Sequence, residues 1–400
     1  MNVKKTLDSK SLLPKEEMLE VKPGFKSLEI GIPKESSFQE NRVSLTPDSV
    51  GVLVANGHSV IIEKDAGLSA NFNDDEYISK GAHIASSNNE VFKANYILKI
   101  EPPTEDELSL MNDSQVLISA LQMNTRSVKF FETLNKKRLT ALAFEFIKDQ
   151  HNKLPFVRIM SEIAGNTSML IAGEYLSTAN NGKGLMLGGV SGLIPTSVVI
   201  IGAGTVGEYA CRTALGLGSS VVVFDDSVTK LRRLQNNINS RISTSTMQPK
   251  VLSKALKRAD VVIAALQIGN GRVPCVVSDH MVQSMKSGSI VIDVSIDQGG
   301  CFETSEVTSH KKPVFVKHDV IHYCVPNIAS RVARTASLSI SNLLTPILIN
   351  IGDLGGIDNA IRKNEFLRSG IYNYSNKHTN KILSKNFKLS YYDLNLLMGE

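Results

Sequence analysis

The sequence predicts an α/β protein with two doubly wound domains, the second inserted into a discontinuous first one. Three observations predict this class. Short β-branched runs alternate with helical segments along most of the chain. A glycine-rich turn at residues 202–207 lies between a predicted strand and a predicted helix. A long apolar helix, expected at about residues 331–351, can carry the chain back to the first domain.

Length and composition fit this class. The chain has 400 residues, enough for two domains that each bury a core. Its net charge of +5 is small for that length, its Lys and Arg are scattered, and it has no Trp, so no nucleic-acid partner is expected. The four cysteines are far apart, which predicts reduced thiols in a cytoplasmic protein or simply small buried side chains. No His/Cys/Asp group has metal-ligand spacing, and we expect no metal.

Residues 1–27 are polar and mixed in charge, and are expected to form a short helix or a loose arm. They lack the apolar stretch of a signal peptide. The most apolar segment, residues 338–351, contains Ser339, Pro346 and Asn350, so a buried helix explains it better than a membrane span.

The first domain is predicted from residues 28–155 and 334–400, with the tail after residue 352 rejoining it. Alternation of strands and helices predicts a parallel or mostly parallel sheet. The strands are expected at residues 28–32, 59–63, 83–85, 96–100, 115–120 and 140–144. Helices are expected at residues 47–56, 74–80, 87–93 and 127–135, with a short one after the loop 101–107.

The second domain is predicted from residues 156–333 and begins with a long amphipathic helix at about residues 159–180. Its strands are expected at residues 197–201, 221–224, 261–265 and 289–293, with edge strands at 314–316 and 321–323. The helices between them are expected at residues 208–217, 229–237, 249–258 and 279–285.

The second domain is organised around residues 197–227, which predict a strand, a tight turn, a helix, a strand and a terminal acid. Gly202, Gly204 and Gly207 form G-x-G-x-x-G, which permits the turn, the approach of a pyrophosphate and close helix packing. The helix that follows offers free N–H groups to a phosphate. Asp225 ends the second strand, where it can bind an adenosine ribose. This unit predicts a Rossmann-like dinucleotide site; the alternative is glycines that serve packing alone.

Because cofactors bind at the carboxyl ends of parallel strands, the chemistry is expected in the loops after the strands of both domains. Arg42 follows the first strand and suits two-point carboxylate binding; the alternative is a surface ion pair with Glu35 or Glu40. Lys99 ends another strand and would add a second cation for an acid with an adjacent carbonyl. The alternative for Lys99 is a solvated strand end.

In the second domain, Asp297 follows a buried strand and can hold an ammonium or move a proton next to a nicotinamide. The alternative for Asp297 is a turn-capping aspartate. Asn327 follows another strand and is a candidate for hydrogen bonds to the cofactor. No Ser/His/Asp order indicates a hydrolase.

Several of these segments resemble one known family from about residue 28 to the end: GIPKESSFQENRVSLTP, LKIEPP, MSEIAGNTS, GAGTVG, SIDQGGCFETS and CVPNIASRVART. They resemble the alanine dehydrogenase and pyridine-nucleotide transhydrogenase α-subunit family. The resemblance implies a discontinuous substrate domain and a central NAD domain, commonly assembled as a hexamer. It also implies the NAD-dependent oxidative deamination of L-alanine to pyruvate and ammonia.

Position by position, the resemblance implies that Arg42 and Lys99 hold the pyruvate carboxylate and carbonyl, and that Asp297 is the catalytic acid. It also implies contacts to NAD, which with the glycine turn give the expected cofactor residues Ser161, Gly202, Gly204, Val206, Gly207, Asp225, Lys230 and Asn327.

The sequence departs from the family at one catalytic position. Gln122 stands where alanine dehydrogenases carry a catalytic histidine. Glutamine can hydrogen-bond a carbonyl but cannot exchange a proton near neutral pH. Either Asp297 and a water carry the protons, or the substrate differs, or the activity is weak. Val206 also departs from the usual glycine pattern, and we expect little effect from it.

An NAD-dependent amino-acid dehydrogenase is the leading hypothesis. The alternative is the soluble NAD(H)-binding α subunit of a proton-translocating transhydrogenase, which would need a membrane partner. A nucleotide sensor without catalysis is a third hypothesis, motivated by Gln122 alone. Arg42, Lys99 and Asp297 favour the dehydrogenase, because a transhydrogenase needs no keto-acid clamp.

Overall fold

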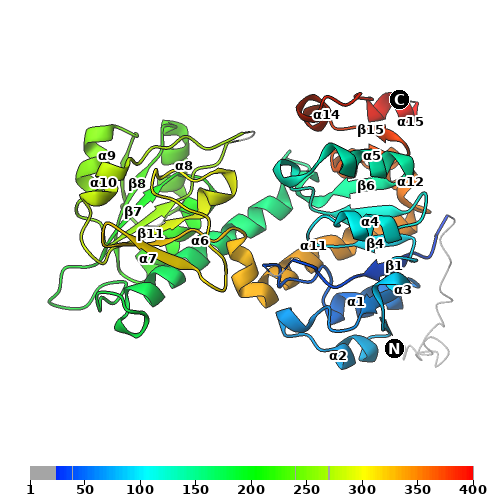
Figure 1. Ribbon diagram of the computed structural model, residues 1–400, viewed down its shortest axis with the longest axis horizontal. Helices are drawn as coiled ribbons and strands as arrows, with labels where there is room; N and C mark the ends of the chain where they lie inside the picture. Colours follow the sequence, from blue (N-terminus) through cyan, green and yellow to red (C-terminus); the bar gives the residue numbers. More distant parts are fainter. Residues whose placement is uncertain (1–23, 38, 239, 269–270, 400) are drawn as a thin grey trace, which may run out of the picture.

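The computed structural model describes residues 24–37, 39–238, 240–268 and 271–399; the expectations for residues 1–23 lie outside this part. The chain forms two lobes, each a twisted sheet with helices on both faces (Figure 1). Two long helices, α6 (Pro155–Leu176) and α11 (Ala333–Asp353), run between the lobes. The predicted class of two doubly wound α/β domains is confirmed. The predicted domain limits, at residues 155/156 and 333/334, stay predictions.

The first sheet has the order β15-β14-β6-β5-β4-β1-β2-β3. Six neighbouring strands are parallel, as expected for a sheet built from alternating strands and helices. These are β1 (Glu29–Ile32), β2 (Ser59–Glu63), β3 (His83–Ala85), β4 (Tyr96–Leu98), β5 (Val116–Ser119) and β6 (Thr140–Ala143). Two strands of the tail, β14 (Ile371–Tyr374) and β15 (Lys377–His378), add an antiparallel edge beside β6.

The helices of this lobe start where local sequence signals place them. Pro47 occupies the first turn of α1, where its missing N–H costs nothing. Capping boxes begin α2 and α4, because the side chains of Asn73 and Thr104 accept from N–H groups three residues on. The helices are α1 (Pro47–Ala55), α2 (Asp74–Ser79), α3 (Asn88–Val91), α4 (Glu105–Leu110) and α5 (Val128–Lys136), with α12 (Ile357–Lys363), α13 (Glu365–Arg368), α14 (Lys381–Phe387) and α15 (Leu394–Met398) in the tail.

The second sheet has the order β12-β13-β11-β10-β7-β8-β9, and only β12 is antiparallel to its neighbour. Its strands are β7 (Ser197–Ile201), β8 (Ser220–Phe224), β9 (Ser243–Ser245), β10 (Val261–Ala264), β11 (Ile290–Asp293), β12 (Val314–Lys317) and β13 (Val320–Tyr323). Its helices are α7 (Thr205–Gly216), α8 (Val228–Asn237), α9 (Pro249–Leu256) and α10 (Asp279–Gln283). The edge strand β9 was not predicted, because its three polar residues lack the apolar run of a buried strand.

The predicted limits of two helices are wrong. The long helix expected at residues 159–180 is α6, which begins at Pro155 and ends at Leu176. Proline fits the first turn of a helix, and this signal outweighs the later start that the apolar pattern suggested. The helix expected from residue 208 is α7, which begins at Thr205 directly after the glycine turn.

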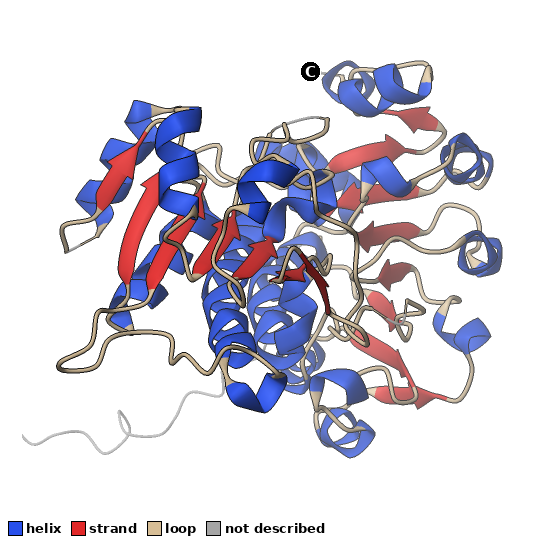
Figure 2. Cartoon of the chain, turned by 60° about the vertical axis from the view of Figure 1, so that its left-hand side comes forward, coloured by secondary structure: helices blue, strands red, loops and turns tan. Residues whose placement is uncertain are grey.

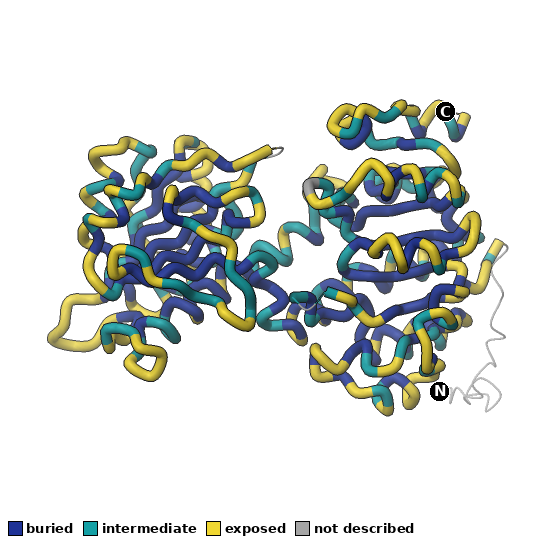
Figure 3. Tube along the Cα trace, in the orientation of Figure 1, coloured by how far each residue is buried: buried dark blue, intermediate teal, exposed yellow. Residues whose placement is uncertain are grey.

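Both sheets are covered on their two faces. Figure 2 shows helices on either side of the strands of each sheet. Strands β4, β5, β6, β10 and β11 are buried at every residue, as expected for central parallel strands (Figure 3). Each lobe therefore carries two apolar clusters, one on each side of its sheet.

The helix α11 belongs to the core of the first lobe and packs on α1, α6 and α12. The stretch Ile328–Asp353 is long and apolar enough to span a membrane by length and composition alone, and it is the only such helix in the described part of the chain. Its burial against other helices is that of a core helix, as the sequence predicted. Serines along it accept backbone N–H groups of the loop after β1: Asn41 to Ser330 at 2.8 Å, Val43 to Ser337 at 2.9 Å and Thr46 to Ser341 at 3.0 Å.

The crossing of α6 and α7 fixes one side of the second sheet. At Gly165 of α6, an added Cβ would lie 2.5 Å from the carbonyl oxygen of Val206 and 2.9 Å from the nitrogen of Ala210. The two helix backbones therefore touch at this glycine, and only glycine permits that distance.

We predict that Gly165→Ala lowers the thermal unfolding midpoint, because the two helices must move apart. The expected destabilisation is about 1–3 kcal/mol, typical of an overpacked core site. Gly216→Ala, at the end of α7, is the matched control because its Cβ would meet nothing within 4 Å. The control should be neutral or slightly stabilising, and equal midpoints for the two variants would contradict the proposed contact.

Candidate active site

Arg42 lies in the loop after β1, where the serines of α11 hold the backbone. Its guanidinium forks onto the buried carboxylate of Glu40, with Nε 2.7 Å from Oε1 and a terminal nitrogen bound to Oε2. Burial pushes the pKa of Glu40 upward, but the charge and hydrogen bonds of Arg42 hold it below its ordinary value. The ion pair considered as the alternative therefore exists, but it is buried and not on the surface.

Lys99, one residue beyond β4, has a fully buried side chain. Its ammonium lies 3.1 Å from Oε1 of Glu107 and 3.2 Å from Oε2 of Glu35. The alternative of a solvated strand end is wrong. Burial raises the pKa of Glu35 to about 7, with Lys99 opposing and Glu40 adding to the rise. Burial lowers the pKa of Lys99, and the two carboxylates more than reverse that effect.

Glu107 serves two structural roles at once. Its Oε2 accepts from the backbone N–H of Thr104 at 2.7 Å and closes the capping box of α4. Its Oε1 holds Lys99. The pattern Thr-x-x-Glu at residues 104–107 is a capping signal that could have placed this carboxylate from the sequence.

Gln122 follows β5 and adopts a left-handed backbone conformation, with φ of +46°. Its side chain donates a hydrogen bond to the carboxylate of Glu101, which lies two residues beyond Lys99. Glu101 also lies close to the charges of Arg42 and Lys99. The three residues predicted from the first domain therefore meet around a carboxyl group that the sequence reasoning missed.

Asp297 comes from the other lobe, in the turn Val294–Gln298 after β11, and its carboxylate faces the charge of Arg42. Asp297 as a whole residue is exposed, but protein atoms surround its carboxyl group. The loss of hydrating water raises the pKa of that carboxyl to about 6. The backbone N–H of Asn327 and the charge of Arg42 oppose this rise. The turn-capping role belongs to Asp293, whose carboxylate accepts from Ser295 at 3.0 Å.

The two lobes touch at Glu40. The side-chain amide of Asn327, from the loop after β13, donates to Oε2 of Glu40 at 2.8 Å. His310, which the sequence reasoning did not select, donates its backbone N–H to Gln39 and lies close to the charges of Glu40 and Arg42. No local pattern marks His310, because its neighbours come from the other domain.

The glycine turn between β7 and α7 suits a bound diphosphate. Gly202 has φ of +114°, and a Cβ on Gly207 would lie 1.9 Å from the carbonyl oxygen of Gly202. An added Cβ at Gly204 would project into open space, so this backbone is free to be approached by a ligand at the start of α7. Val206 is half-buried and contributes its carbonyl to the α6–α7 crossing.

Asp225 ends β8 beside this turn. Its two oxygens accept from the backbone N–H groups of Ala203 and Ser227, both at 2.8 Å, and the ammonium of Lys230 lies 4.0 Å away. Ser161 donates its hydroxyl to Val157 within α6, one residue from Met160, whose sulfur contacts Arg42 at 3.4 Å. The roles of these residues toward a cofactor stay predictions.

Two doubly wound lobes, a glycine turn fit for a dinucleotide, and acids and cations that meet between the lobes define a class of two-domain, nucleotide-dependent oxidoreductases. Residues 31–164 match the family description "Alanine dehydrogenase/PNT, N-terminal domain", and residues 168–381 match "Alanine dehydrogenase/PNT, C-terminal domain". The chain belongs to this alanine dehydrogenase/PNT family.

Individual relatives agree with the family. An alanine dehydrogenase of Staphylococcus haemolyticus is 35% identical over 365 residues, which cover 91% of this chain and 97% of the relative. A solved L-alanine dehydrogenase has a TM-score of 0.84 and 34% identity, covering 90% of this chain and 99% of its own. A solved transhydrogenase from Sinorhizobium meliloti is 22% identical with a TM-score of 0.76, covering 88% and 99%, and shows a shared fold.

We predict that Glu107→Gln destabilises the protein by about 3 kcal/mol, because it removes one of the two carboxylates that compensate a buried ammonium. Glutamine keeps the capping box, so the loss reports on Lys99. Glu105→Gln is the matched control, since Glu105 is exposed and pairs with the exposed Lys129. Its effect should stay within about 0.5 kcal/mol. Thermal unfolding of both variants measures the difference.

Proposed function

We propose that this protein is an NAD-dependent alanine dehydrogenase that reversibly converts L-alanine to pyruvate and ammonia. One observation carries the proposal. Arg42 and Lys99 of the first lobe and Asp297 of the second meet between the lobes, in a chain 35% identical to an alanine dehydrogenase over nearly its whole length.

The clamp residues retain hydrogen-bonding capacity for a keto acid. Glu40 takes Nε and one terminal nitrogen of Arg42, and a guanidinium has further N–H groups that can bind a substrate carboxylate. Lys99 uses its ammonium on Glu35 and Glu107, and its third proton is left for the carbonyl oxygen. Asp297 then moves the proton of the water that attacks the imino carbon.

NAD is the proposed cofactor, and it supplies the acceptor for the hydride that leaves Cα. Its diphosphate would lie on the turn of Gly202, Gly204 and Gly207 at the start of α7. Asp225 would bind the adenosine ribose, and Asn327 and Ser161 lie on elements that border the junction of the lobes.

The transhydrogenase α subunit is the weaker alternative. The relatives at 34–36% identity over most of the chain are named alanine dehydrogenases, while the likeness to a transhydrogenase at 22% identity concerns the fold. A chain that binds NADH without turning over any keto acid would favour the alternative or a sensor.

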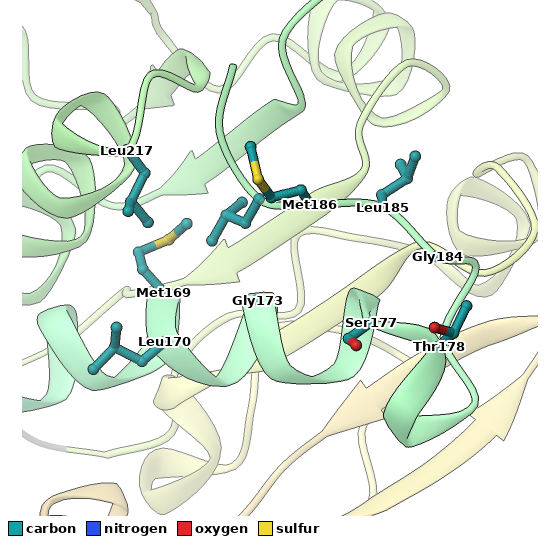
Figure 4. Close-up of a pocket in the computed structure, with 10 residues that line it drawn as sticks. Met169, Leu170, Gly173, Ser177, Thr178, Gly184, Leu185, Met186 and Leu217 are labelled. Atoms are coloured by element: carbon teal, nitrogen blue, oxygen red, sulfur yellow. The ribbon is translucent and has the colours of Figure 1, made fainter. Parts of the chain in front are cut away.

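We further propose a cytoplasmic homo-oligomer, with a hexamer as the family resemblance implies. All four cysteines are free thiols, which suits a reducing compartment. The surface of the second lobe also suits an oligomer. A pocket of about 470 Å³, lined mainly by apolar side chains, lies between α6 and the segment after it (Figure 4). Four of the residues that line it have exposed apolar side chains, as on a surface that another subunit covers: Leu170, Leu185, Met186 and Leu217.

The direct test is a spectrophotometric assay of NADH oxidation with pyruvate and ammonium, run beside a panel of other 2-oxo acids. Pyruvate should be reduced faster than the other acids. Tight NADH binding with no turnover of any acid would remove the dehydrogenase from consideration.

For the cofactor, we predict preference for NAD(H) over NADP(H). The carboxylate of Asp225 accepts hydrogen bonds from a 2′-hydroxyl and repels a 2′-phosphate. Arg233 is engaged with the carbonyl oxygen of Ala203 at 2.9 Å and is thus less free to receive a phosphate. Fluorescence titration with both reduced cofactors measures the preference, and tighter NADPH binding would refute it.

For catalysis, we predict that Asp297→Asn lowers kcat at least ~10²-fold, the low end for loss of a general acid or base. Gln122→Ala should cost only about tenfold, the scale of one neutral hydrogen bond. Gln122→His should be tolerated. Steady-state rates of the three variants test this division of labour, which is wrong if Gln122→Ala is as damaging as Asp297→Asn.

A further inference from the structure

Glu101 is a half-buried residue whose carboxyl group has no part in the reaction steps described above. It follows β4, and its backbone N–H donates to Oε2 of Glu35 at 3.4 Å. Glu35, Glu40 and Glu107 each form an ion pair with Arg42 or Lys99. Within the described ranges Glu101 forms none.

The groups that face Glu101 come from three segments of the first lobe. The carboxylate of Glu40 and the guanidinium of Arg42 approach from the loop after β1, Lys99 from its own strand end, and Gln122 from the loop after β5. Arg126 lies close enough to feel its charge. Acidic groups and three cations thus surround Glu101, and its carboxylate accepts a hydrogen bond from the side chain of Gln122.

Gln122 is itself held in place. Glu145, after β6, accepts the N–H of Leu121 at 2.7 Å and also a hydrogen bond from the backbone of Gln122. These contacts stabilise the left-handed backbone of Gln122, which is uncommon for a residue other than glycine. An amide carries no titratable proton, so the contact of Gln122 with Glu101 positions a group that does.

The surroundings also tune Glu101 toward proton transfer. Burial and the nearby Glu40 raise its pKa above its ordinary value, while Arg42, the bond from Gln122 and Lys99 oppose the rise. A carboxyl shifted in this direction holds its proton closer to neutral pH, where acid–base catalysts work. Glu40, whose pKa is lowered by its ion pair, is not suited to that task.

We propose that Glu101, positioned by Gln122, is a second proton carrier that serves the amino nitrogen of the substrate. The proposal rests on the proposed dehydrogenase function and deepens it. It assigns the proton traffic that the family's histidine would handle to the carboxyl group that Gln122 contacts.

In the alanine direction, the Glu101 carboxylate takes one proton from the α-ammonium, so an N–H bond breaks and an O–H bond forms. The freed nitrogen pair forms the C=N bond as the Cα hydride leaves to NAD. Water adds to the imino carbon and gives a proton to Asp297, which releases it to solvent. The nitrogen then takes its proton back from Glu101 and leaves as ammonia, and the proton of the new hydroxyl passes to ammonia to give ammonium and the keto acid.

The two carriers come from different lobes. The guanidinium of Arg42 interacts electrostatically with the carboxylate of Glu101 in its own lobe and with that of Asp297 in the other lobe. A substrate whose carboxylate binds Arg42 therefore has a carboxyl group from each lobe near its reacting carbon. Two carboxyls in unlike surroundings can divide the proton transfers of the nitrogen and of the water.

The first experiment measures kcat/KM of the wild-type enzyme for alanine, with NAD as the cofactor, across a range of pH. Two carboxylates that must both be ionised give an acid limb of log(kcat/KM) against pH with a slope of two. Glu101→Gln should lower kcat at least ~10²-fold, leave KM for pyruvate within about threefold, and reduce the slope to one. Glu105→Gln, an exposed acid four residues away, is the matched control and should keep both rate and slope.

Rescue separates a proton carrier from a structural residue. Formate should restore part of the activity of Glu101→Ala. Adding Gln122→His to Glu101→Gln should return the slope from one to two, because an imidazole and the carboxyl of Asp297 must then both be deprotonated. If Glu101→Gln does not fold, Glu101→Asp replaces it and should keep the slope of two at a reduced rate. Full activity with an unchanged slope in Glu101→Gln would overturn the proposal. Absence of turnover in the wild type would instead remove the proposed function itself.

Discussion

The buried carboxylate of Glu40 is the interaction on which the rest of the site depends. It accepts the fork of Arg42 on one side and the amide of Asn327 on the other. The same group therefore orients the substrate-binding cation and joins the two lobes. Removing it would leave a buried guanidinium without its partner, and one contact between the domains would be lost with it.

The first lobe compensates each buried cation with its own acids. Lys99 is fully buried, and it remains charged because Glu35 and Glu107 share its ammonium. With Glu101 added, the site holds more carboxyl groups than cations. An anionic keto acid therefore binds most easily when one of these carboxyls carries a proton, and the raised pKa values of Glu35 and Glu101 meet that need.

Local patterns predicted the fold well. β-branched runs fixed the central strands, because a strand buried on both faces must be apolar at every position. The glycines at residues 202–207 fixed the nucleotide unit, because only glycine fits the turn and the close packing. The same patterns missed β9 and misplaced the ends of α6, since a short polar edge strand and a first-turn proline leave little trace in apolar periodicity.

The sequence by itself determined which polar and charged residues follow the ends of the strands, and this order of residues was enough to select Arg42, Lys99, Gln122 and Asp297. Only the tertiary structure decided what those residues contact. Glu107 reaches Lys99 from a helix cap, Glu101 meets Gln122 across two strands, and Asn327 reaches Glu40 from the other domain. Such partners depend on the strand order and on the docking of the lobes, and no spacing along the chain encodes them.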